Sequence, residues 1–319
     1  MRVLVLGAAG FIGSRMVRAL EVREDVTEIV ASDLRSPQDA PPFGAKVQLV
    51  PGDVLEPQLF NSLFAQPFDT IFHLAASLTL DAEADFARGL QVNVLALMSA
   101  LEHCRAQSAA HCLAPKFLFA SSISSFGGAL PDVVDDFVFQ TPQTSYGTHK
   151  AIAEQLINDY SRRGFIDARV LRLPIVLTHP GPPTSSVSDR IASLIREPLN
   201  GKDVVCPLAP ETKLALASVD KVVEAFLALH DLPASVFSTT RVLNLPALTS
   251  TPGDLVAAVW RASGGKCGRY LWAQDAAMQR VVSGWPSAFT SAFAFEHGIT
   301  GDASADAIVA AYLKARDGA

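Results

Sequence analysis

The sequence predicts an α/β fold, a doubly wound parallel sheet with a smaller C-terminal lobe. Apolar runs rich in β-branched residues alternate with segments of helical period through the first half of the chain, which is the pattern of βαβ units that feed a parallel sheet. The first apolar run leads directly into a glycine-rich turn that opens a helix. After Pro174 the alternation stops at the proline-rich loop 179–183, and this break predicts a separate lobe.

The first half of the chain supplies most of the expected sheet. Short apolar runs predict strands at 2–6, 28–33, 46–50, 69–74, 115–120 and 167–173. Apolar residues at helical spacing predict helices at 11–21, 56–64, 83–107 and 144–163.

The second half returns once to this sheet. Helices are expected from Ser186 to Pro198 and from 218 to 230, and a strand is expected at 241–245. The remainder, from Pro252 onward, mixes helices with short strands. We therefore expect a main Rossmann-type domain of residues 1–176 with about 215–246, and a small substrate-binding lobe of residues 177–214 and 247–319.

The composition excludes several classes of protein. The 319 residues are 49% hydrophobic and 18% charged, with a net charge of −6, and a chain of this length can bury a large core. No run of Lys or Arg could neutralise a line of phosphates, so no nucleic acid partner is expected. No apolar stretch approaches the roughly 20 residues needed to cross a membrane. The segment Met1–Gly7 leads into a turn rather than a cleavage site, so it predicts a strand and not an export signal.

Four cysteines are scattered along the chain: Cys104, Cys112, Cys206 and Cys267. Without an export signal, they are expected to be reduced thiols in the cytoplasm. The pairs at 103–104 and 111–112 each combine His with Cys, but neither has close-set further ligands. No metal site is therefore expected.

The turn after the first strand carries glycines at positions 7, 10 and 13. Gly7 would allow the tight turn, Gly10 would let the backbone approach a pyrophosphate, and Gly13 would allow close packing of helix on strand. Phe11 and Ile12 lie at the helix N-terminus, where free N–H groups attract an anion. The spacing differs from that of the general dinucleotide motif, and an ordinary glycine turn is the alternative.

Acidic residues after the second and third strands support dinucleotide binding. Asp33 ends the second strand 20 residues beyond Gly13, where a carboxylate can bind the ribose 2′-hydroxyl and would repel a 2′-phosphate. This favours NAD over NADP, although Arg35 could instead accept a 2′-phosphate. Asp53 and Val54 follow the third strand and are suitably placed for the adenine edge. The alternative for Asp53 is to cap the helix at 56–64.

Tyr146 and Lys150 lie four residues apart and therefore on one face of a helix. A free tyrosine has a pKa of about 10, but a neighbouring ammonium favours the phenolate, so Tyr146 could act as a base near neutral pH. Lys150 could also bind a cofactor ribose. The alternative is a helix that merely exposes a tyrosine and a lysine.

The fifth strand ends in a cluster of hydroxyl side chains, residues 121–125, at the carboxyl edge of the sheet. Ligands bind at this edge in such folds, so a serine there could orient a substrate oxygen beside Tyr146. An ordinary serine-rich turn is the alternative. Serine hydrolase chemistry is set aside because no histidine base and no nucleophile-elbow motif accompany the cluster.

In combination, these residues resemble the extended short-chain dehydrogenases/reductases, also called the NAD-dependent epimerase/dehydratase family. The resemblance covers most of the chain and rests on five landmarks in order: 7–13, His73-Leu74-Ala75-Ala76, Ser121-Ser122, Tyr146 with Lys150, and Arg172-Leu173-Pro174. It implies that Ser122 is the catalytic serine, Tyr146 the base or acid, and Lys150 its activator and ribose ligand. NAD is the implied cofactor.

Further cofactor contacts follow from the same resemblance. It places Leu74, Ala75 and Ala76 along the cofactor channel, and Pro174 to Val176 near the nicotinamide. Asn93 matches an asparagine that the family often carries in the fourth helix, where it can bond backbone near the active site. An ordinary helical role for Asn93 is as acceptable.

Departures from the family pattern bear on the reaction. The family's sugar-nucleotide dehydratases carry Thr-Asp-Glu where this chain has Ser122-Ile123-Ser124, so dehydration is not expected. The C-terminal half has few basic residues for a nucleotide sugar. The sequences of the segments 121–128, 171–176 and 185–190 resemble those of family members that oxidise a four-carbon sugar acid.

The expected reaction is therefore NAD-dependent oxidation of a small sugar acid. Ser122 and Tyr146 are expected to bind the substrate hydroxyl, and Arg190 is the candidate to bind its carboxylate, with Lys213 as a weaker candidate. The alternative for both basic residues is a solvated surface charge. The alternatives are a 4-epimerase that retains NAD, a uronate or L-threonine dehydrogenase, and a dinucleotide-sensing regulator without activity. The helices at 83–107 and 144–163 are long enough to pair in a homodimer, which the family resemblance favours.

Overall fold

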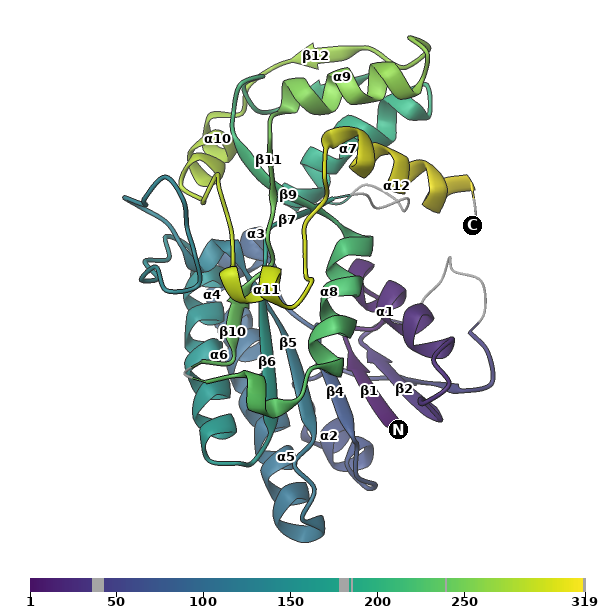
Figure 1. Cartoon of the computed structure of the whole chain (residues 1–319), viewed down its shortest axis with the longest axis vertical. Helices are drawn as coiled ribbons and strands as arrows, with labels where there is room; N and C mark the ends of the chain where they lie inside the picture. Colours follow the sequence, from purple (N-terminus) through teal and green to yellow (C-terminus); the bar gives the residue numbers. More distant parts are fainter. Residues whose placement is uncertain (36–42, 178–183, 185, 239, 318–319) are drawn as a thin grey trace. The chain divides into compact units, whose positions relative to one another are not determined.

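The computed structural model describes residues 1–35, 43–177, 184, 186–238 and 240–317 (Figure 1). These residues form two compact units. The first unit comprises residues 1–122, 144–172 and 223–243, and the second comprises 123–143, 173–222 and 244–319. Compared with the predicted domains, this division places the segment 123–143 in the second unit.

The first unit is built on a seven-stranded sheet with the order β10-β6-β5-β4-β1-β2-β3. Its strands are β1 (Arg2–Leu6), β2 (Glu28–Asp33), β3 (Val47–Pro51), β4 (Thr70–His73), β5 (Lys116–Ser122), β6 (Asp167–Leu173) and β10 (Val242–Asn244). β1 pairs in parallel with both β2 and β4, so the strand order reverses at β1. Ligands of doubly wound sheets bind at the carboxyl ends of the strands beside such a reversal. The predicted fold class is confirmed.

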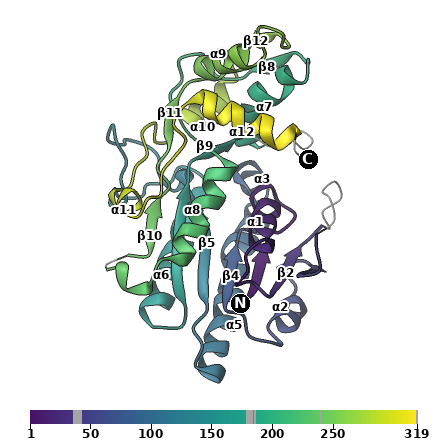
Figure 2. The same ribbon diagram turned by 45° about the vertical axis from the view of Figure 1, so that its right-hand side comes forward.

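Helices cover both faces of this sheet (Figures 1 and 2). One face carries α1 (Phe11–Glu21) and the C-terminal part of α8 (Val219–Asp231), and the other carries α2 (Pro57–Leu63), α5 (Ala96–His111) and α6 (Ser145–Arg162). The core against α2, α5 and α6 includes Phe60, Leu97, Phe117 and Ile157, all buried. Burial on both faces explains why the strands read as continuous apolar runs.

The predicted single helix at 83–107 is wrong. The chain instead forms α3 (Thr79–Ala84), α4 (Phe86–Leu90), a π-helix (Gln91–Leu95) and then α5. Asp85 leaves the helical conformation, with φ of −133°, and its carboxylate accepts the N–H of Arg88 to cap α4. This local capping bond competes with continuation of the helix. A π-turn inside a helix frequently marks a functional position.

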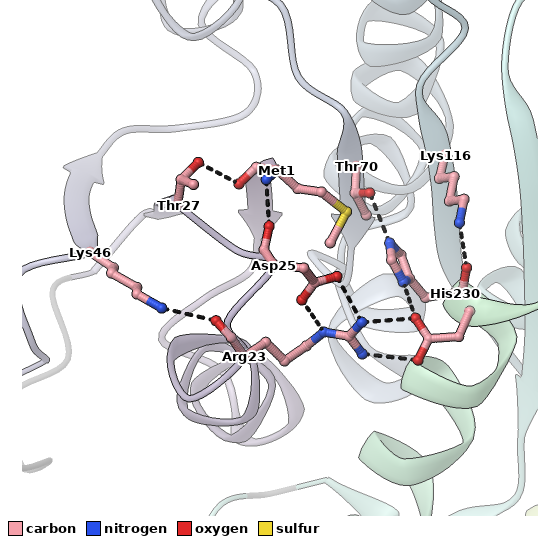
Figure 3. A network of polar contacts seen from close by, with 9 residues as sticks. Met1, Arg23, Asp25, Thr27, Lys46, Thr70, Lys116 and His230 are labelled. Carbon is pink, nitrogen blue, oxygen red and sulfur yellow. Dashed lines mark hydrogen bonds and ion pairs between the residues drawn. The ribbon is translucent and has the colours of Figure 1, made fainter.

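A polar network connects the amino ends of the strands to α8 (Figure 3). Arg23 forms ion pairs with Asp25 at 2.9 Å and with Asp231 at 3.0 Å. The buried His230 ring lies between Asp231, at 2.7 Å from Nδ1, and the Thr70 hydroxyl, at 3.1 Å from Nε2. This network lies at the edge of the sheet opposite the carboxyl ends, so it stabilises the unit rather than the site.

The second unit contains a three-stranded sheet, β11-β9-β7, and a two-stranded sheet, β12-β8. Its strands are β7 (Ile175–Leu177), β8 (Val204–Cys206), β9 (Leu214–Ser218), β11 (Leu248–Ser250) and β12 (Tyr270–Trp272). Its helices are α7 (Val187–Leu199), α9 (Pro252–Ala262), α10 (Ala276–Ser283), α11 (Ala292–Glu296) and α12 (Ala305–Asp317). Within this unit, Phe126 and Val134 of the segment 123–143 form a buried cluster with Phe289. In the part of the chain that the structure describes, no helix is both long and apolar enough to cross a membrane.

Candidate active site

The glycine turn after β1 is sterically restricted to glycine at two positions. Gly7 has φ of +83°, and a Cβ there would lie 2.6 Å from the backbone nitrogen of Ala75. A Cβ on Gly13 would lie 2.0 Å from the carbonyl oxygen of Gly7. α1 begins at Phe11 with Gly10 as its N-cap and without a side-chain capping bond. A narrow backbone turn at a helix N-terminus fits the pyrophosphate of a dinucleotide.

Asp33, the predicted ribose ligand, ends β2 beside the glycine turn. Its carboxylate accepts the N–H of Ala9 at 2.9 Å and that of Arg35 at 3.2 Å, so it is oriented by the glycine turn itself. A surface hollow is lined by Ala8, Ala9, Ala31, Asp33, Arg35, Leu49, Val50 and Pro51. The carboxylate and the Arg35 side chain thus border the same hollow, and the residues present fit an adenosine group.

Asp53 serves the turn between β3 and α2 instead of capping the helix. Its carboxylate accepts the N–H of Leu55 at 3.0 Å and pairs with Arg88 at 3.3 Å. The N-cap of α2 is Glu56, without a side-chain capping bond, so the alternative of Asp53 as the cap is wrong. Val54 is partly buried and packs against the core of the unit.

The turn after β4, residues Leu74 to Ser77, lies directly against the glycine turn. The N–H of Leu74 donates to the carbonyl of Leu6 at 2.9 Å, and the close approach of Ala75 to Gly7 excludes a side chain between them. Asn93, within the π-helix, binds both backbone groups of Ser77 at 2.9 Å. The structure therefore brings together the predicted cofactor residues Gly7, Leu74 and Ala75, with Asn93 behind them.

Ser122, Tyr146 and Lys150 lie at the carboxyl end of β5. Ser122 is the last residue of that strand, and Tyr146 and Lys150 lie on the first turns of α6, which is capped by Thr144. The side chains of Ser122 and Tyr146 are hydrogen-bonded. The Lys150 ammonium donates to the carbonyl of Ala120 at 2.7 Å and lies 5.4 Å from the centre of the Tyr146 ring.

Burial governs the protonation of this pair. It raises the pKa of Tyr146 to about 12, and the hydrogen bond from Ser122 opposes this only in part. Burial also lowers the pKa of Lys150 to about 7, although the negative charge of Glu154 opposes that shift. The sequence predicted that Lys150 would lower the pKa of Tyr146. In these side chains the pKa of Tyr146 is instead raised, because desolvation penalises both the phenolate and the ammonium.

A buried ion pair lies one helical turn beyond Lys150 and was not predicted from the sequence. Glu154 of α6 is fully buried and pairs with Arg172 of β6 at 2.8 Å. Glu154 also accepts a hydrogen bond from Ser121, the neighbour of Ser122. The spacing of four residues from Lys150 could have indicated a carboxylate on the same helix face. Its partner Arg172 belongs to the Arg-Leu-Pro landmark, but nothing in the sequence pairs the two.

The remaining predicted site residues belong to the second unit. Pro174 precedes β7, and Val176 of β7 pairs with Ala217 of β9. Arg190 of α7 forms an ion pair with Asp275 at 2.9 Å, and the Arg190 side chain is 37% exposed. Lys213 is exposed just before β9. Arg190 is thus already bound to a carboxylate, which is the group it was predicted to recognise.

Comparisons with known proteins extend over both units. Residues 3–244 match the family model described as the NAD dependent epimerase/dehydratase family. The chain is 38% identical to the D-erythronate dehydrogenase of Cupriavidus necator, over 98% of both chains. It is 33% identical to that of Haemophilus influenzae, over 98% of this chain and 99% of the relative.

A solved structure described as a nucleoside-diphosphate-sugar epimerase from Agrobacterium tumefaciens is similar in fold. Its TM-score is 0.92 with 29% sequence identity, and the match covers all of this chain and 95% of that one. The predicted family resemblance is therefore confirmed over nearly the whole chain.

Proposed function

Because the chain belongs to the NAD-dependent epimerase/dehydratase family, we propose that it is an NAD-dependent dehydrogenase that oxidises D-erythronate to 2-dehydro-D-erythronate. The observation that carries the proposal is the meeting of Ser122, Tyr146 and Lys150 at the carboxyl edge of the sheet that also bears the glycine turn. Full-length similarity to two D-erythronate dehydrogenases supports the substrate. In this proposal the first unit supplies the catalytic residues and most of the NAD-binding residues.

The proposed residue roles follow from the chemistry of a carbinol carbon that loses a hydride and a proton. Ser122 holds the substrate oxygen by a hydrogen bond, and Tyr146 removes the hydroxyl proton as the carbonyl forms. Lys150 stabilises the phenolate and binds the cofactor ribose. When bound, NAD supplies the hydride acceptor. The residues that would hold it are Gly7, Gly10, Phe11, Ile12, Gly13, Asp33, Asp53, Val54, Leu74, Ala75, Ala76, Asn93, Tyr146, Lys150, Pro174 and Val176.

Arg190 is the proposed ligand of the substrate carboxylate. A guanidinium has five N–H donors in a fixed fork, and the hydrogen bond to Asp275 uses Nη1. The remaining donors can serve a second carboxylate, so the pair with Asp275 would orient Arg190 for the substrate. Lys213 remains the weaker candidate for the same role.

The proposed assembly is a cytoplasmic homodimer. The exposed apolar side chains of Phe86, Leu95, Met98 and Ile152 lie on α4, the π-helix, α5 and α6, which form the helical face that the sequence predicts for pairing. Burial of such side chains between two copies would stabilise a dimer. Light scattering after size exclusion should give twice the mass of 33.9 kDa, and a monomer at micromolar concentration would contradict the proposal.

The test of the activity is a panel of D-erythronate, D-galacturonate and L-threonine, each with NAD and with NADP. Formation of NADH is followed by its absorbance at about neutral to alkaline pH. We expect steady NADH formation with D-erythronate and NAD, and a loss of turnover by at least about three orders of magnitude in Tyr146→Phe with NAD affinity nearly unchanged.

The other arms of the panel separate the alternatives. Turnover only with the uronate or the amino acid would reassign the substrate within the same chemistry. Binding of NAD without NADH formation from any acid would favour the epimerase or the sensing regulator. Unchanged turnover in Tyr146→Phe would refute the catalytic assignment.

A further inference from the structure

The residue next to Lys150 in the catalytic helix is a histidine that the mechanism does not use. His149 is 2% exposed, and its side chain faces α4 and the π-helix. Its ring centre lies 6.0 Å from that of Phe86, and its Cε1 limits the space beside Gly89. The ring Nδ1 lies 3.3 Å from the amide nitrogen of Asn93. His149 therefore contacts both α4 and the π-helix.

Two backbone bonds determine the orientation of the Asn93 amide. Its Oδ1 accepts the N–H of Ser77 and its Nδ2 donates to the carbonyl of Ser77, each at 2.9 Å. Exchanging oxygen and nitrogen would break both bonds, so the amide orientation follows from the backbone and is not arbitrary. The nitrogen of Asn93 therefore faces His149.

This orientation determines the protonation state of His149. An amide nitrogen only donates, so Nδ1 of His149 must accept, and the single proton of the neutral ring must be on Nε2. A doubly protonated ring would set an N–H against the N–H of Asn93. Burial also lowers the pKa of His149, in the same direction as the positive charge of Lys150 and against the negative charge of Glu83 on α3. The other facing residues of the described neighbours, Phe86, Gly89 and Asn93, carry no charge.

We propose that His149, as the neutral ring with its proton on Nε2, is a positioning residue that ties the Asn93 amide, already oriented by Ser77, to the catalytic helix and thereby holds the turn Leu74–Ser77 against that helix. The inference rests on the proposed function in one respect, which is that this turn lines the NAD site. The chain of contacts runs from α6 through Asn93 to Ser77 and lies entirely within the first unit.

Direct NAD binding by calorimetry, without substrate, tests the proposal in two matched variants. His149→Gln keeps an acceptor oxygen for Asn93 and does not titrate, and His149→Leu keeps the volume but offers no acceptor. We expect His149→Gln to bind NAD within about threefold of the wild type and His149→Leu to bind it at least about tenfold more weakly. In an Asn93→Ala background the two variants should bind NAD equally, because the contact is already absent.

Two further measurements test the protonation state of His149. Nitrogen NMR of the wild type labelled with 15N-histidine should show a neutral ring with its proton on Nε2 whose signal is absent from His149→Gln. As pH falls below about 6.5, NAD affinity should fall more steeply in the wild type than in His149→Gln, because only the wild type can protonate this ring.

The outcomes separate the inference from the proposed function. Equal NAD binding by His149→Leu and the wild type, or a proton on Nδ1, would overturn the positioning role even if D-erythronate is the substrate. If no acid is oxidised but the two variants differ as expected, the inference stands and the substrate assignment fails.

Discussion

Replacing Lys150 by methionine should stabilise the folded protein while it abolishes the dehydrogenase activity. Lys150 is 3% exposed, and burial lowers its pKa to about 7. Below that pKa the folded state must hold a buried ammonium, whereas the unfolded chain keeps the same ammonium in water. Methionine has a similar length and no charge, so it fills the same space without that penalty.

The size of the effect follows from proton linkage. An unfolded lysine has a pKa of about 10.4, so at pH 7 the ionisation of Lys150 lowers the free energy of unfolding by about 4 kcal/mol, and at pH 9 by about 2 kcal/mol. Loss of the hydrogen bond to Ala120 costs about 1 kcal/mol at every pH. The pKa of Lys150 is lower in the folded state than in the unfolded state. Between pH 7 and 10 the unfolded state therefore binds more protons than the folded state, so the free energy of unfolding of the wild type rises with pH. Lys150→Met should be more stable by about 3 kcal/mol at pH 7 and about 1 kcal/mol at pH 9.

Urea denaturation at pH 7, 8 and 9 measures this difference. The matched control is Lys202→Met, whose native side chain is 73% exposed, and it should change stability by less than about 0.5 kcal/mol at each pH. Turnover with D-erythronate should be lost in Lys150→Met only. A Lys150→Met protein that is less stable than the wild type, with a difference that does not change with pH, would refute the reasoning and show that water solvates the ammonium.

Three further perturbations test other parts of the structure. Asp33→Ala should weaken NAD binding about 10- to 100-fold and improve the relative binding of NADP, because it removes the acceptor of the ribose hydroxyl. Calorimetry with both cofactors measures these affinities. An unchanged ratio of NAD to NADP affinity would make Asp33 purely structural. Glu154→Gln should lower the free energy of unfolding by about 3–5 kcal/mol, because it removes the carboxylate charge opposite the buried guanidinium of Arg172. The double variant Glu154→Leu with Arg172→Met should stay near the wild type in urea denaturation. Equal losses in both would argue against the ion pair. Burial lowers the pKa of His230 despite the opposing hydrogen bond to Asp231, so the wild type should lose stability as pH falls below about 6.5. His230→Gln should show a smaller fall of Tm between pH 7.5 and 5.5. Parallel curves of Tm against pH for the two proteins would contradict this linkage.

Local patterns in the sequence determined the sheet of the first unit and the positions of its candidate residues. The predicted strands at 2–6, 28–33 and 167–173 match β1, β2 and β6, because a parallel strand buried on both faces is a continuous apolar run. The glycines at 7 and 13 were predictable because a narrow turn tolerates no other residue. Tyr146 and Lys150 share a helix face because of their spacing alone. The predicted strand at 115–120 stops two residues before Ser122, which the structure makes the last residue of β5.

Tertiary structure alone decided how those residues are paired and charged. The helix at 83–107 is interrupted because Asp85 caps a new helix and Asn93 binds the distant backbone of Ser77, and neither contact leaves a periodic signal in the sequence. The partners Glu154 and Arg172 come from different elements, so spacing cannot pair them. The pKa values of Tyr146 and Lys150 depend on how much water the fold removes from around them, a quantity set by residues far apart in the chain. Sequence therefore specified which groups are present and on which element each lies, and packing determined their protonation, because desolvation and long-range contacts exist only in the folded chain.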